Sequence, residues 1–377
     1  MAFPFFLRIP YDCNSVISLG LVKKSLYLCS IVEKKIAIRE QSLEQLQEQL
    51  VALNEPKFRS KQLFQWLWEK SCVDFNQMSN LSLGLREKLI ENYFFREVEV
   101  DSLQVAADKT IKSIFKLFDG EKIEGVLIPT SDRMTACVSS QVGCSLSCKF
   151  CATGYMDRKR NVYAEEIYDQ VVLINQQALK NYGQGLTNIV FMGMGEPLLN
   201  YSQVLKAIDR ITAEDGLNMS PRRITVSTAG IAKMIKKLGD DAVRFNLALS
   251  LHAANDEKRD KIMPINEQNS LEVLKDALLY FHAKTKNQIT FEYIVFNNFN
   301  DSIEDAKELA VFCKQIPSKV NLIEYNPIDM ADFQNAEEDK IDRFAAFLES
   351  QNISVTVRRS RGKDIDAACG QLAIKEK

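Results

Sequence analysis

Hydrophobic residues early in the chain recur at the spacing of amphipathic helices. Four leucines lie three or four positions apart: Leu43, Leu46, Leu50 and Leu53. This spacing places them on one face of a helix, and similar apolar stripes follow within 63–67 and 81–90. The pattern predicts a small helical domain over residues 41–98. Residues 1–40 form an extension to which no element is assigned.

From about residue 100 the pattern changes to short β-rich runs. Ile111–Phe118 and Ile123–Ile128 flank Asp119-Gly120, a dipeptide typical of hairpin turns. Six further runs are predicted to be strands: Met134–Val138, Asn188–Met192, Ile224–Ser227, Phe245–Leu251, Ile289–Phe296 and Val320–Tyr325. Apolar residues with a 3.6-residue period predict helices between and after them, around Ile167–Ala178, Val204–Ile211, Leu271–Phe281, Ala306–Cys313 and Ile341–Leu348.

The repeated alternation of strand and helix predicts an α/β fold with a parallel sheet. Polar motifs directly after several strands suit a barrel, because barrel enzymes carry their active sites at the carboxyl ends of the strands. We therefore expect a partial (βα)6 TIM-like barrel with its preceding hairpin over 99–352, and a separate C-terminal segment over 353–377. A doubly wound sheet would show the same alternation, so periodicity alone leaves both architectures open.

Composition narrows the class of protein without identifying a partner. Of 377 residues, 46% are hydrophobic and 26% are charged, which is ordinary for a globular protein. The net charge of −2 gives no overall attraction to nucleic acid, so any such contact must come from local patches. Basic residues cluster at 158–160, 222–223 and 358–363. Such runs usually cover a solvated face, but here they also suggest phosphate contacts.

The N-terminal stretch is apolar without the pattern of a membrane span. Arg8, Pro10 and the Lys23-Lys24 pair interrupt every run long enough to cross a bilayer. The basic segment that precedes the hydrophobic core of a secretory signal is also missing. Nine cysteines without such a signal indicate a reducing compartment. We therefore expect a cytoplasmic protein that does not contact membranes.

Three cysteines stand close together in the loop that follows the first predicted barrel strand. Cys144, Cys148 and Cys151 are spaced Cys-x3-Cys-x2-Cys. A 4Fe–4S cluster normally takes four cysteine ligands, so three leave one iron open for a substrate or cofactor. The alternatives are a zinc site and three core cysteines. Zinc would need a fourth ligand, usually in a second Cys-x2-Cys pair, and the sequence has no such pair.

Several other predicted strands end in residues that could bind a ligand. Gly193–Pro197 is a glycine-rich turn containing Glu196, and its glycines would let the backbone approach a ligand closely. Ser227, the run Ser250-Leu251-His252, and Asn326 follow at later strand ends. Hydroxyls and amides at such positions suit a nucleoside cofactor, although Ser and Asn also cap helices well. A lone histidine such as His252 is more often structural than catalytic.

Two further cysteines have a setting that could be chemical. Cys369 is flanked by small residues near the C-terminus, so its thiol would be accessible. Cys137 lies seven positions before the first cluster cysteine, within reach of the mouth of a barrel. The alternative for each is a small buried hydrophobe, which is the usual fate of a free cysteine.

These motifs together resemble one enzyme family. The cysteine triplet and the glycine-rich turn resemble the signature of radical S-adenosylmethionine (SAM) enzymes. From about residue 42 to residue 375, the chain is similar to the dual-specificity RNA methyltransferases of the RlmN type. The matching runs are 137–144, 193–200, 250–252 and 361–372. That family methylates carbon 2 of an adenosine in 23S ribosomal RNA and of the adenosine after the tRNA anticodon.

The resemblance implies a role for each motif residue. Cys144, Cys148 and Cys151 would bind a 4Fe–4S cluster. The SAM contacts would be Gly195, Glu196, Ser227, Ser250, Leu251, His252 and Asn326. Cys369 would carry the methyl group, Cys137 would release the covalent adduct through a disulfide bond, and Glu124 would act as the base. Without the family, Glu124 would be interpreted as an exposed strand residue.

The family also implies cofactors and partners. Two SAM molecules are expected per turnover, because one methylates Cys369 and the second yields a radical. The partners would be 23S rRNA, tRNA and an electron donor such as flavodoxin or ferredoxin, acting on a monomer. The helical domain over 41–98 would be either a packing domain or an RNA-docking domain.

Two other functions remain open from the sequence. A sister enzyme of the Cfr type methylates carbon 8 of the same ribosomal adenosine and shares the cluster and both cysteines, although the run 361–366 favours the carbon 2 group. The third possibility is an iron–sulfur or zinc-binding module without catalysis. Such a module would have no need of Gly193–Pro197 or of Cys369.

Overall fold

The computed structural model describes residues 35–374, and its contacts divide the chain into two units. The smaller unit consists of the described residues up to Lys61 together with Asp74–Phe95. Strand β1 (Ile36–Ala37) pairs in parallel with β2 (Tyr93–Phe94). Helix α2 (Leu43–Ala52) buries Leu46 and Leu50, and helix α4 (Leu83–Asn92) buries Leu85 and Leu89. Helix α3 (Phe58–Trp68) begins in this unit and continues into the larger one.

The larger unit consists of Gln62–Val73 and the chain from Arg96 onward. Its ten-stranded sheet has the order β14-β13-β12-β11-β10-β9-β6-β5-β4-β3. The strands are β3 (Glu99–Val105), β4 (Ile111–Lys116), β5 (Lys122–Pro129), β6 (Met134–Cys137), β9 (Asn188–Phe191), β10 (Ile224–Thr228), β11 (Asn246–Ser250), β12 (Ile289–Val295), β13 (Ser318–Glu324) and β14 (Val355–Arg358). Pairing is parallel from β6 to β14 and antiparallel among β3, β4, β5 and β6.

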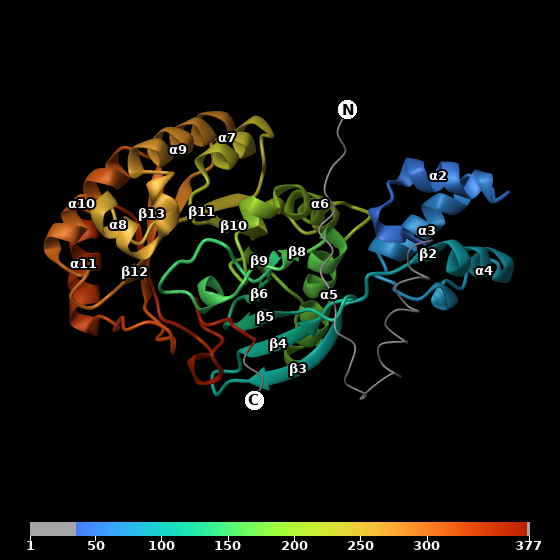
Figure 1. Ribbon diagram of the computed structural model, residues 1–377, viewed down its shortest axis with the longest axis horizontal. Coiled ribbons are helices and arrows are strands. Elements are labelled where there is room, and N and C mark those ends of the chain that lie inside the picture. The colour runs from blue at the N-terminus through green and yellow to red at the C-terminus, as the bar shows by residue number, and fades with distance from the viewer. Residues whose placement is uncertain (1–34, 375–377) are drawn as a thin grey trace, which may run out of the picture. The chain divides into compact units, whose positions relative to one another are not determined.

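Helices connect the parallel strands and pack on the outer side of the curved sheet (Figure 1). They are α5 (Ala164–Tyr182), α6 (Tyr201–Thr212), α7 (Ala232–Asp240), α8 (Asp256–Ile262), α9 (Leu271–Thr285), α10 (Ile303–Lys314) and α11 (Glu338–Ser350). Phe291 and Tyr293 of β12 contact the rings of Phe312 and Phe344 on α10 and α11. Side chains alternate along a strand, so Glu292 points to the opposite, inner side of the sheet.

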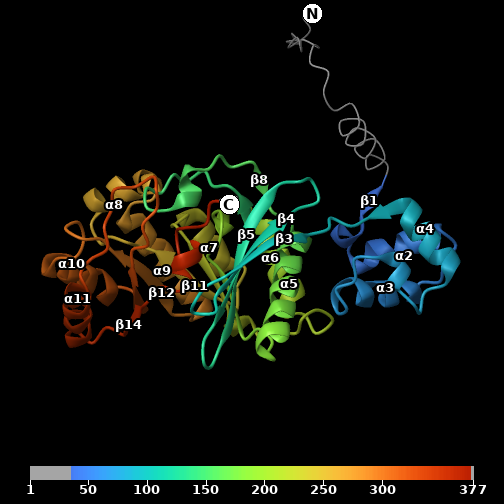
Figure 2. The ribbon, with the colours of Figure 1, turned by 90° about the horizontal axis from the view of Figure 1, so that it is seen from below.

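The strand order confirms the predicted α/β barrel type. The six predicted strands follow one another across the sheet in chain order, whereas a doubly wound sheet would reverse its order. The predicted hairpin is β4–β5, and Figure 2 shows these twisted strands beside α5. The pattern missed β3, α7, α8 and β14. Strand β3 is an edge strand that is exposed on both faces, so its sequence shows no alternation.

Strand β14 extends the parallel sheet into the region predicted to be a separate C-terminal segment. Its Val355 and Val357 alternate with Thr356 and Arg358, a pattern too short to stand out from the sequence. None of the helices within 35–374 is long and apolar enough to cross a membrane. The predictions for residues 1–34 lie outside the described residues.

Candidate active site

The three predicted cluster cysteines lie on one loop that returns to its own starting point. Two short strands, β7 (Gln141–Val142) and β8 (Arg160–Asn161), pair antiparallel and close this loop, residues 143–159, which we call the cluster loop. Gly143 has φ of +76°, and a side chain there would meet the carbonyl oxygen of Asp157 at 2.1 Å. The neck of the loop therefore requires glycine.

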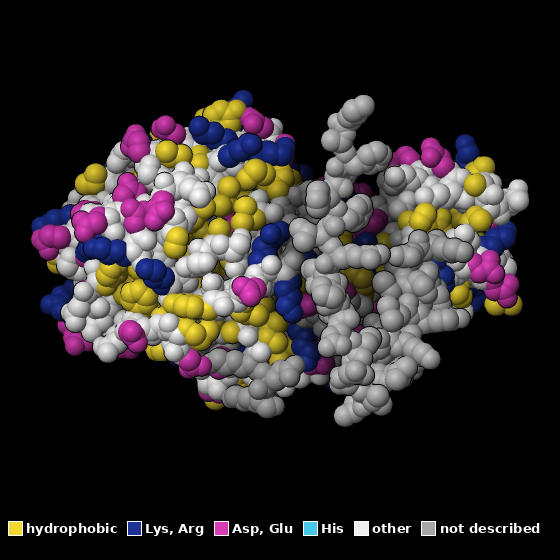
Figure 3. All heavy atoms as spheres, viewed as in Figure 1, with side chains coloured by type: hydrophobic (Ala, Val, Ile, Leu, Met, Phe, Trp, Pro, Cys, Tyr) yellow, Lys and Arg dark blue, Asp and Glu magenta, His cyan; other side chains and the backbone are white. Residues whose placement is uncertain are grey.

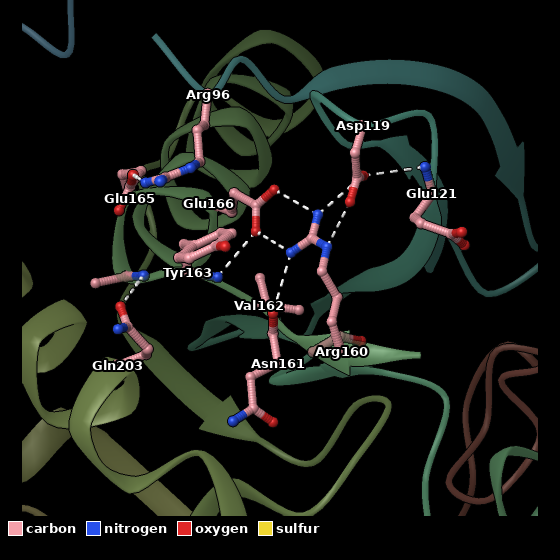
Figure 4. Close-up of polar contacts among 12 residues, drawn as sticks. Arg96, Asp119, Glu121, Arg160, Asn161, Val162, Tyr163, Glu165, Glu166 and Gln203 are labelled. Carbon is pink, nitrogen blue, oxygen red and sulfur yellow. Dashed lines mark hydrogen bonds and ion pairs between the residues drawn. The ribbon is translucent and has the colours of Figure 1, made fainter. Parts of the chain in front are cut away.

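Arg160 binds two carboxylates at this neck (Figure 4). Its guanidinium makes paired hydrogen bonds of 2.6 and 3.0 Å with Asp119, at the tip of the β4–β5 hairpin, and of 2.8 and 2.9 Å with Glu166 of α5. Paired hydrogen bonds of this kind fix both the distance and the relative orientation of the guanidinium and each carboxylate. Arg160 thus ties the cluster loop to the hairpin whose second strand carries Glu124, and to helix α5.

The underside of the cluster loop packs on the carboxyl ends of the parallel strands. The ring centroid of Phe150 lies 4.7 Å from that of His252 and 5.8 Å from that of Phe296. Arg259 of α8 is fully buried beneath, where it donates hydrogen bonds to the carbonyl oxygens of Ala229, Ser250 and Leu251. Burial lowers the pKa of Arg259 to about 10.

Arg259 is a site residue that sequence reasoning missed. It joins the ends of β10 and β11, and its positive charge acts on the thiol of Cys148. No motif marks it, since α8 is short and charged on the surface. The only available signal was an arginine shortly after Ser250-Leu251-His252.

The glycine-rich turn after β9 holds Glu196 in a closed set of hydrogen bonds. Gly195 has φ of +91°, and a side chain there would lie 2.3 Å from Cβ of Gln141. The buried carboxylate of Glu196 accepts the backbone N–H groups of Ala229 at 2.7 Å and Leu198 at 2.9 Å. Burial raises the pKa of Glu196, and these hydrogen bonds oppose the shift. The turn is thereby fastened to the end of β10.

The remaining strand-end residues fall into two groups. Ser227 and Ser250 lie side by side on β10 and β11, with their hydroxyl oxygens 3.5 Å apart. Asn326 lies beyond β13, where its amide donates to the carbonyl oxygen of Cys369 at 3.2 Å and its Oδ1 is buried without a hydrogen-bond partner. That free acceptor is available to a ligand. Leu251 is fully buried.

His252 fills a structural position in the described chain. Its Nδ1 accepts the backbone N–H of Ile294 at 3.1 Å, and its carbonyl oxygen accepts the amide of Asn300. Burial, followed by the positive charge of Arg259, lowers the pKa of His252 to about 3. The imidazole is therefore neutral at physiological pH, and its Nδ1 is already occupied.

The C-terminal segment, residues 359–374, brings Cys369 to the cluster loop. The backbone N–H of Ala152 donates to Gly370 O at 2.7 Å, and the hydroxyl of Thr153 donates to Leu372 O at 2.6 Å. Cys369 itself is exposed. Gly370 and Leu372 thus contact the cluster loop although they lie more than 200 positions after it in the sequence.

Glu124 holds the same segment from the other side. Its Oε2 accepts the backbone N–H of Ala373 at 2.8 Å, and its Oε1 lies 3.4 Å from the ammonium of buried Lys112. Glu124 is fully buried, in contrast to the exposed position that the sequence alone suggested. Cys137 pairs with Val126, two positions from Glu124, so both side chains lie on one face of the sheet.

The cysteines Cys137 and Cys369 lie close enough to interact electrostatically. Burial raises the pKa of Cys137, and the neighbouring Cys369 raises it further. All described cysteines are free thiols. The disulfide expected between these two is therefore not formed in this state of the protein.

The cluster loop fits an iron–sulfur cluster better than a single zinc ion. Burial raises the pKa of Cys148 well above its ordinary value, and Cys151 and Cys144 add to the shift. Thiols in this environment ionise readily only when a bound cation compensates the charge. Within 35–374, no three Cys, His, Asp or Glu side chains surround one point as a lone metal ion requires. A cluster, by contrast, takes each thiolate at a different iron.

Two of the three basic clusters are engaged within the protein. Lys159 pairs with Glu121 at 2.7 Å, next to the Arg160 pairs, and both Arg359 and Lys363 pair with Glu324. These side chains are therefore occupied by carboxylates and are poor candidates for phosphate. In the described part of the chain, Arg158, Arg222 and Arg223 have no carboxylate partner.

Comparison with known proteins identifies the family. Residues 36–94 match the ribosomal RNA large subunit methyltransferase N-terminal domain, and residues 138–310 match the radical SAM superfamily. A protein of Cytophaga hutchinsonii, described as a probable dual-specificity RNA methyltransferase RlmN, is 59% identical over 94% of this chain and 99% of its own length. The chain belongs to the RlmN family of dual-specificity RNA methyltransferases.

Other relatives agree with this assignment. The dual-specificity RNA methyltransferase RlmN of Geotalea uraniireducens is 42% identical over 90% of this chain and 97% of its own length. The crystal structure of a radical SAM methyltransferase from Sphaerobacter thermophilus matches with a TM-score of 0.84 and 39% identity, over 89% of this chain and 99% of that one. The protein is thus a radical SAM RNA methyltransferase, and its superfamily implies an iron–sulfur cluster and SAM. The alternative of a non-catalytic binding module was wrong.

Proposed function

We propose that the enzyme methylates carbon 2 of adenosine in 23S rRNA and of the adenosine on the 3′ side of the tRNA anticodon. The proposal depends chiefly on one observation. The segment carrying Cys369 is fastened by hydrogen bonds to the cluster loop, to Glu124 and to Asn326, beside Cys137. One accessible thiol, one buried thiol and one buried carboxylate thus surround the place where a base would react.

Cys144, Cys148 and Cys151 would hold the 4Fe–4S cluster, and Glu196, Ser227, Ser250 and Asn326 are the side chains best placed to bind SAM. When bound, the cluster supplies an electron that cleaves SAM reductively and creates a carbon radical. Gly195 and the backbone of Leu251 and His252 complete the expected SAM contacts. An external reductant of the flavodoxin or ferredoxin class would supply the electron.

The residues of the chain explain why the methyl group travels through a thiol. Carbon 2 of adenine lies between two nitrogens and is not a nucleophile, whereas a thiolate is. The thiolate of Cys369 would displace the methyl group from one SAM and keep it as a thioether. A second SAM per turnover would be needed to activate that methyl group toward the base.

The final steps require a base and a second thiol. With the base joined through a methylene group to the Cys369 sulfur, Glu124 would accept the proton of carbon 2. The thiolate of Cys137 would attack the Cys369 sulfur, which forms a disulfide and breaks the sulfur–carbon bond. The bonding electron pair would stay on the methylene carbon, which would take up a proton to become the methyl group of the product. The external reductant would restore both thiols. The burial of Cys137 would keep it from reacting before this step.

A Cys137→Ala variant tests the assignment directly. It should accumulate a covalent protein–RNA adduct, visible as a shifted band on a denaturing gel, while product formation falls by at least a hundredfold. Cys313→Ala is the matched control, because Cys313 is a buried thiol on α10 away from the site. Normal turnover by Cys137→Ala, without any adduct, would contradict the assignment.

The position of methylation distinguishes this function from that of the Cfr type. Mass spectrometry of digested RNA separates 2-methyladenosine from 8-methyladenosine. We expect 2-methyladenosine from both 23S rRNA and tRNA, and none when the target adenosine is replaced by guanosine. Relatives at 42% and 59% identity are described as dual-specificity RNA methyltransferases, which favours both substrates.

A further inference from the structure

An open cavity of about 480 Å³ lies beside the glycine-rich turn. It is lined by the start of α6 with its preceding 3-10 turn, by the start of α7, and by Asn161 of β8. These elements follow β9 and β10, so the cavity lies on the same rim as the candidate site. Leu198, which lines the cavity, donates its backbone N–H to Glu196. The cavity and the glycine-rich turn therefore share a wall.

The lining is mostly apolar, and its one buried amide is fixed from within the protein. Leu199 is 40% exposed, and Ile231 and Met234 face the same space. The amide nitrogen of Asn200 donates to two backbone carbonyl oxygens at 2.8 Å each, which fixes the orientation of the amide. Its Oδ1 is buried without a hydrogen-bond partner.

The charge around the cavity favours an anion. Lys233 lines it and has no carboxylate partner in the described chain, and Arg158 bonds only to Asn161 there. No acidic residue lines the cavity. Figure 3 shows hydrophobic side chains gathered between α7 and α6 with Lys and Arg side chains beside them.

A second cavity offers a useful contrast. It measures about 440 Å³ and is also partly apolar, but Asp256, Glu272 and Glu308 line it together with two lysines. Three carboxylates would repel the phosphates of a nucleic acid. The two cavities are similar in size and opposite in their suitability for RNA.

We propose that the first cavity binds the base of a nucleotide next to the target adenosine in the RNA strand. This rests on the proposed function, because the target adenosine must leave its stack to reach Cys369, and its neighbour then loses a stacking partner. The apolar wall receives the face of the neighbouring base, and Lys233 binds the adjoining phosphate.

A double-mutant cycle between protein and RNA tests the proposal. RNA hairpins with the target adenosine carry one abasic site at each flanking position in turn, and fluorescence anisotropy measures Kd for the full-length, cluster-containing enzyme. One abasic position should weaken binding by about 5- to 150-fold, the range typical for loss of one stacked base. Leu199→Asp should weaken binding of the intact RNA by a similar factor. It should cause no further loss of affinity for the RNA that carries the abasic site at the sensitive position.

Two more variants complete the experiment. Lys233→Ala, an exposed position, should lower the slope of log Kd against log salt by about 0.7, as expected for one phosphate contact on a single strand. Val311→Asp in the second cavity is the matched control and should bind as the parent does, since Val311 is 62% exposed. Circular dichroism establishes that each variant is folded.

The proposal is overturned if the loss of binding free energy caused by Leu199→Asp adds in full to the loss caused by every abasic site. It is also overturned if Leu199→Asp binds RNA as tightly as Val311→Asp. An unchanged salt slope in Lys233→Ala would show that Lys233 does not contact a phosphate. Because these measurements report binding, they are independent of the carbon that is methylated. Failure of the carbon 2 chemistry and failure of this subsite therefore produce different results.

Discussion

The cluster loop and the C-terminal segment meet at one site but are held in place by different means. The cluster loop closes on itself through β7 and β8, and its three cysteines lie within eight positions. The C-terminal segment depends on distant partners: Gly362 N–H donates to Asp108, Ala373 N–H to Glu124, and Lys363 to Glu324. A local loop can be recognised from a short motif. A segment with distant anchors can be placed only by the whole fold.

Of the changes that test this comparison, replacing one proposed cluster ligand should have the largest effect. Cys148→Ala leaves two thiols on the cluster loop, so we expect nearly all iron and sulfide to be lost after anaerobic reconstitution, with no methylation. Cys313→Ala should retain both. Colorimetric iron and sulfide assays measure the outcome, and a fully loaded Cys148→Ala protein would show that this cysteine is not a ligand.

Breaking the clamp at the neck of the cluster loop should have an intermediate effect. Arg160→Ala leaves buried Glu166 and half-buried Asp119 without their partner, which should lower the free energy of unfolding by about 2–4 kcal/mol. Urea unfolding measures the loss. Arg158→Ala, which removes no carboxylate pair, should change stability by no more than about 0.5 kcal/mol.

The smallest effect is expected from the anchor of the C-terminal segment, and it depends on pH. Burial alone would raise the pKa of Glu324, but hydrogen bonds from Lys363 and Arg359 outweigh it and hold the pKa below the usual 4.5. A pKa lowered by folding means that the anchor is fully present above pH 4.5 and is lost as the pH falls below it.

Hydrogen exchange of the Ser360 amide, which donates to Glu324, reports this anchor. Glu324→Gln should raise the exchange rate of the Ser360 amide at neutral pH by about tenfold, because one charged hydrogen bond is lost. In the parent protein, the exchange rate of the Ser360 amide, corrected for the intrinsic pH dependence of amide exchange, should rise in the same way only in acid, where Glu324 becomes protonated. Glu338→Gln is the control, because Glu338 is exposed and lies 3.9 Å from Arg359. Equal exchange in both variants would show that Glu324 does not hold the segment.

The sequence determined those features that depend on neighbouring residues. The six barrel strands and the β4–β5 hairpin follow from local periodicity and from the Asp119-Gly120 turn. The cysteine triplet and the glycine-rich turn were enough to indicate the radical SAM family, which the comparisons confirmed.

Only the tertiary structure decided features whose partners are distant in the chain. Glu124 was expected to be exposed, yet the C-terminal segment covers it. Arg359 and Lys363 resembled a phosphate-binding run, yet both form ion pairs with Glu324. Arg259 belongs to no recognisable motif, and only the fold places it beneath the cluster loop. The physical reason is the same for each: burial and ion pairing are set by which surfaces meet, and periodicity encodes only which face of an element is apolar.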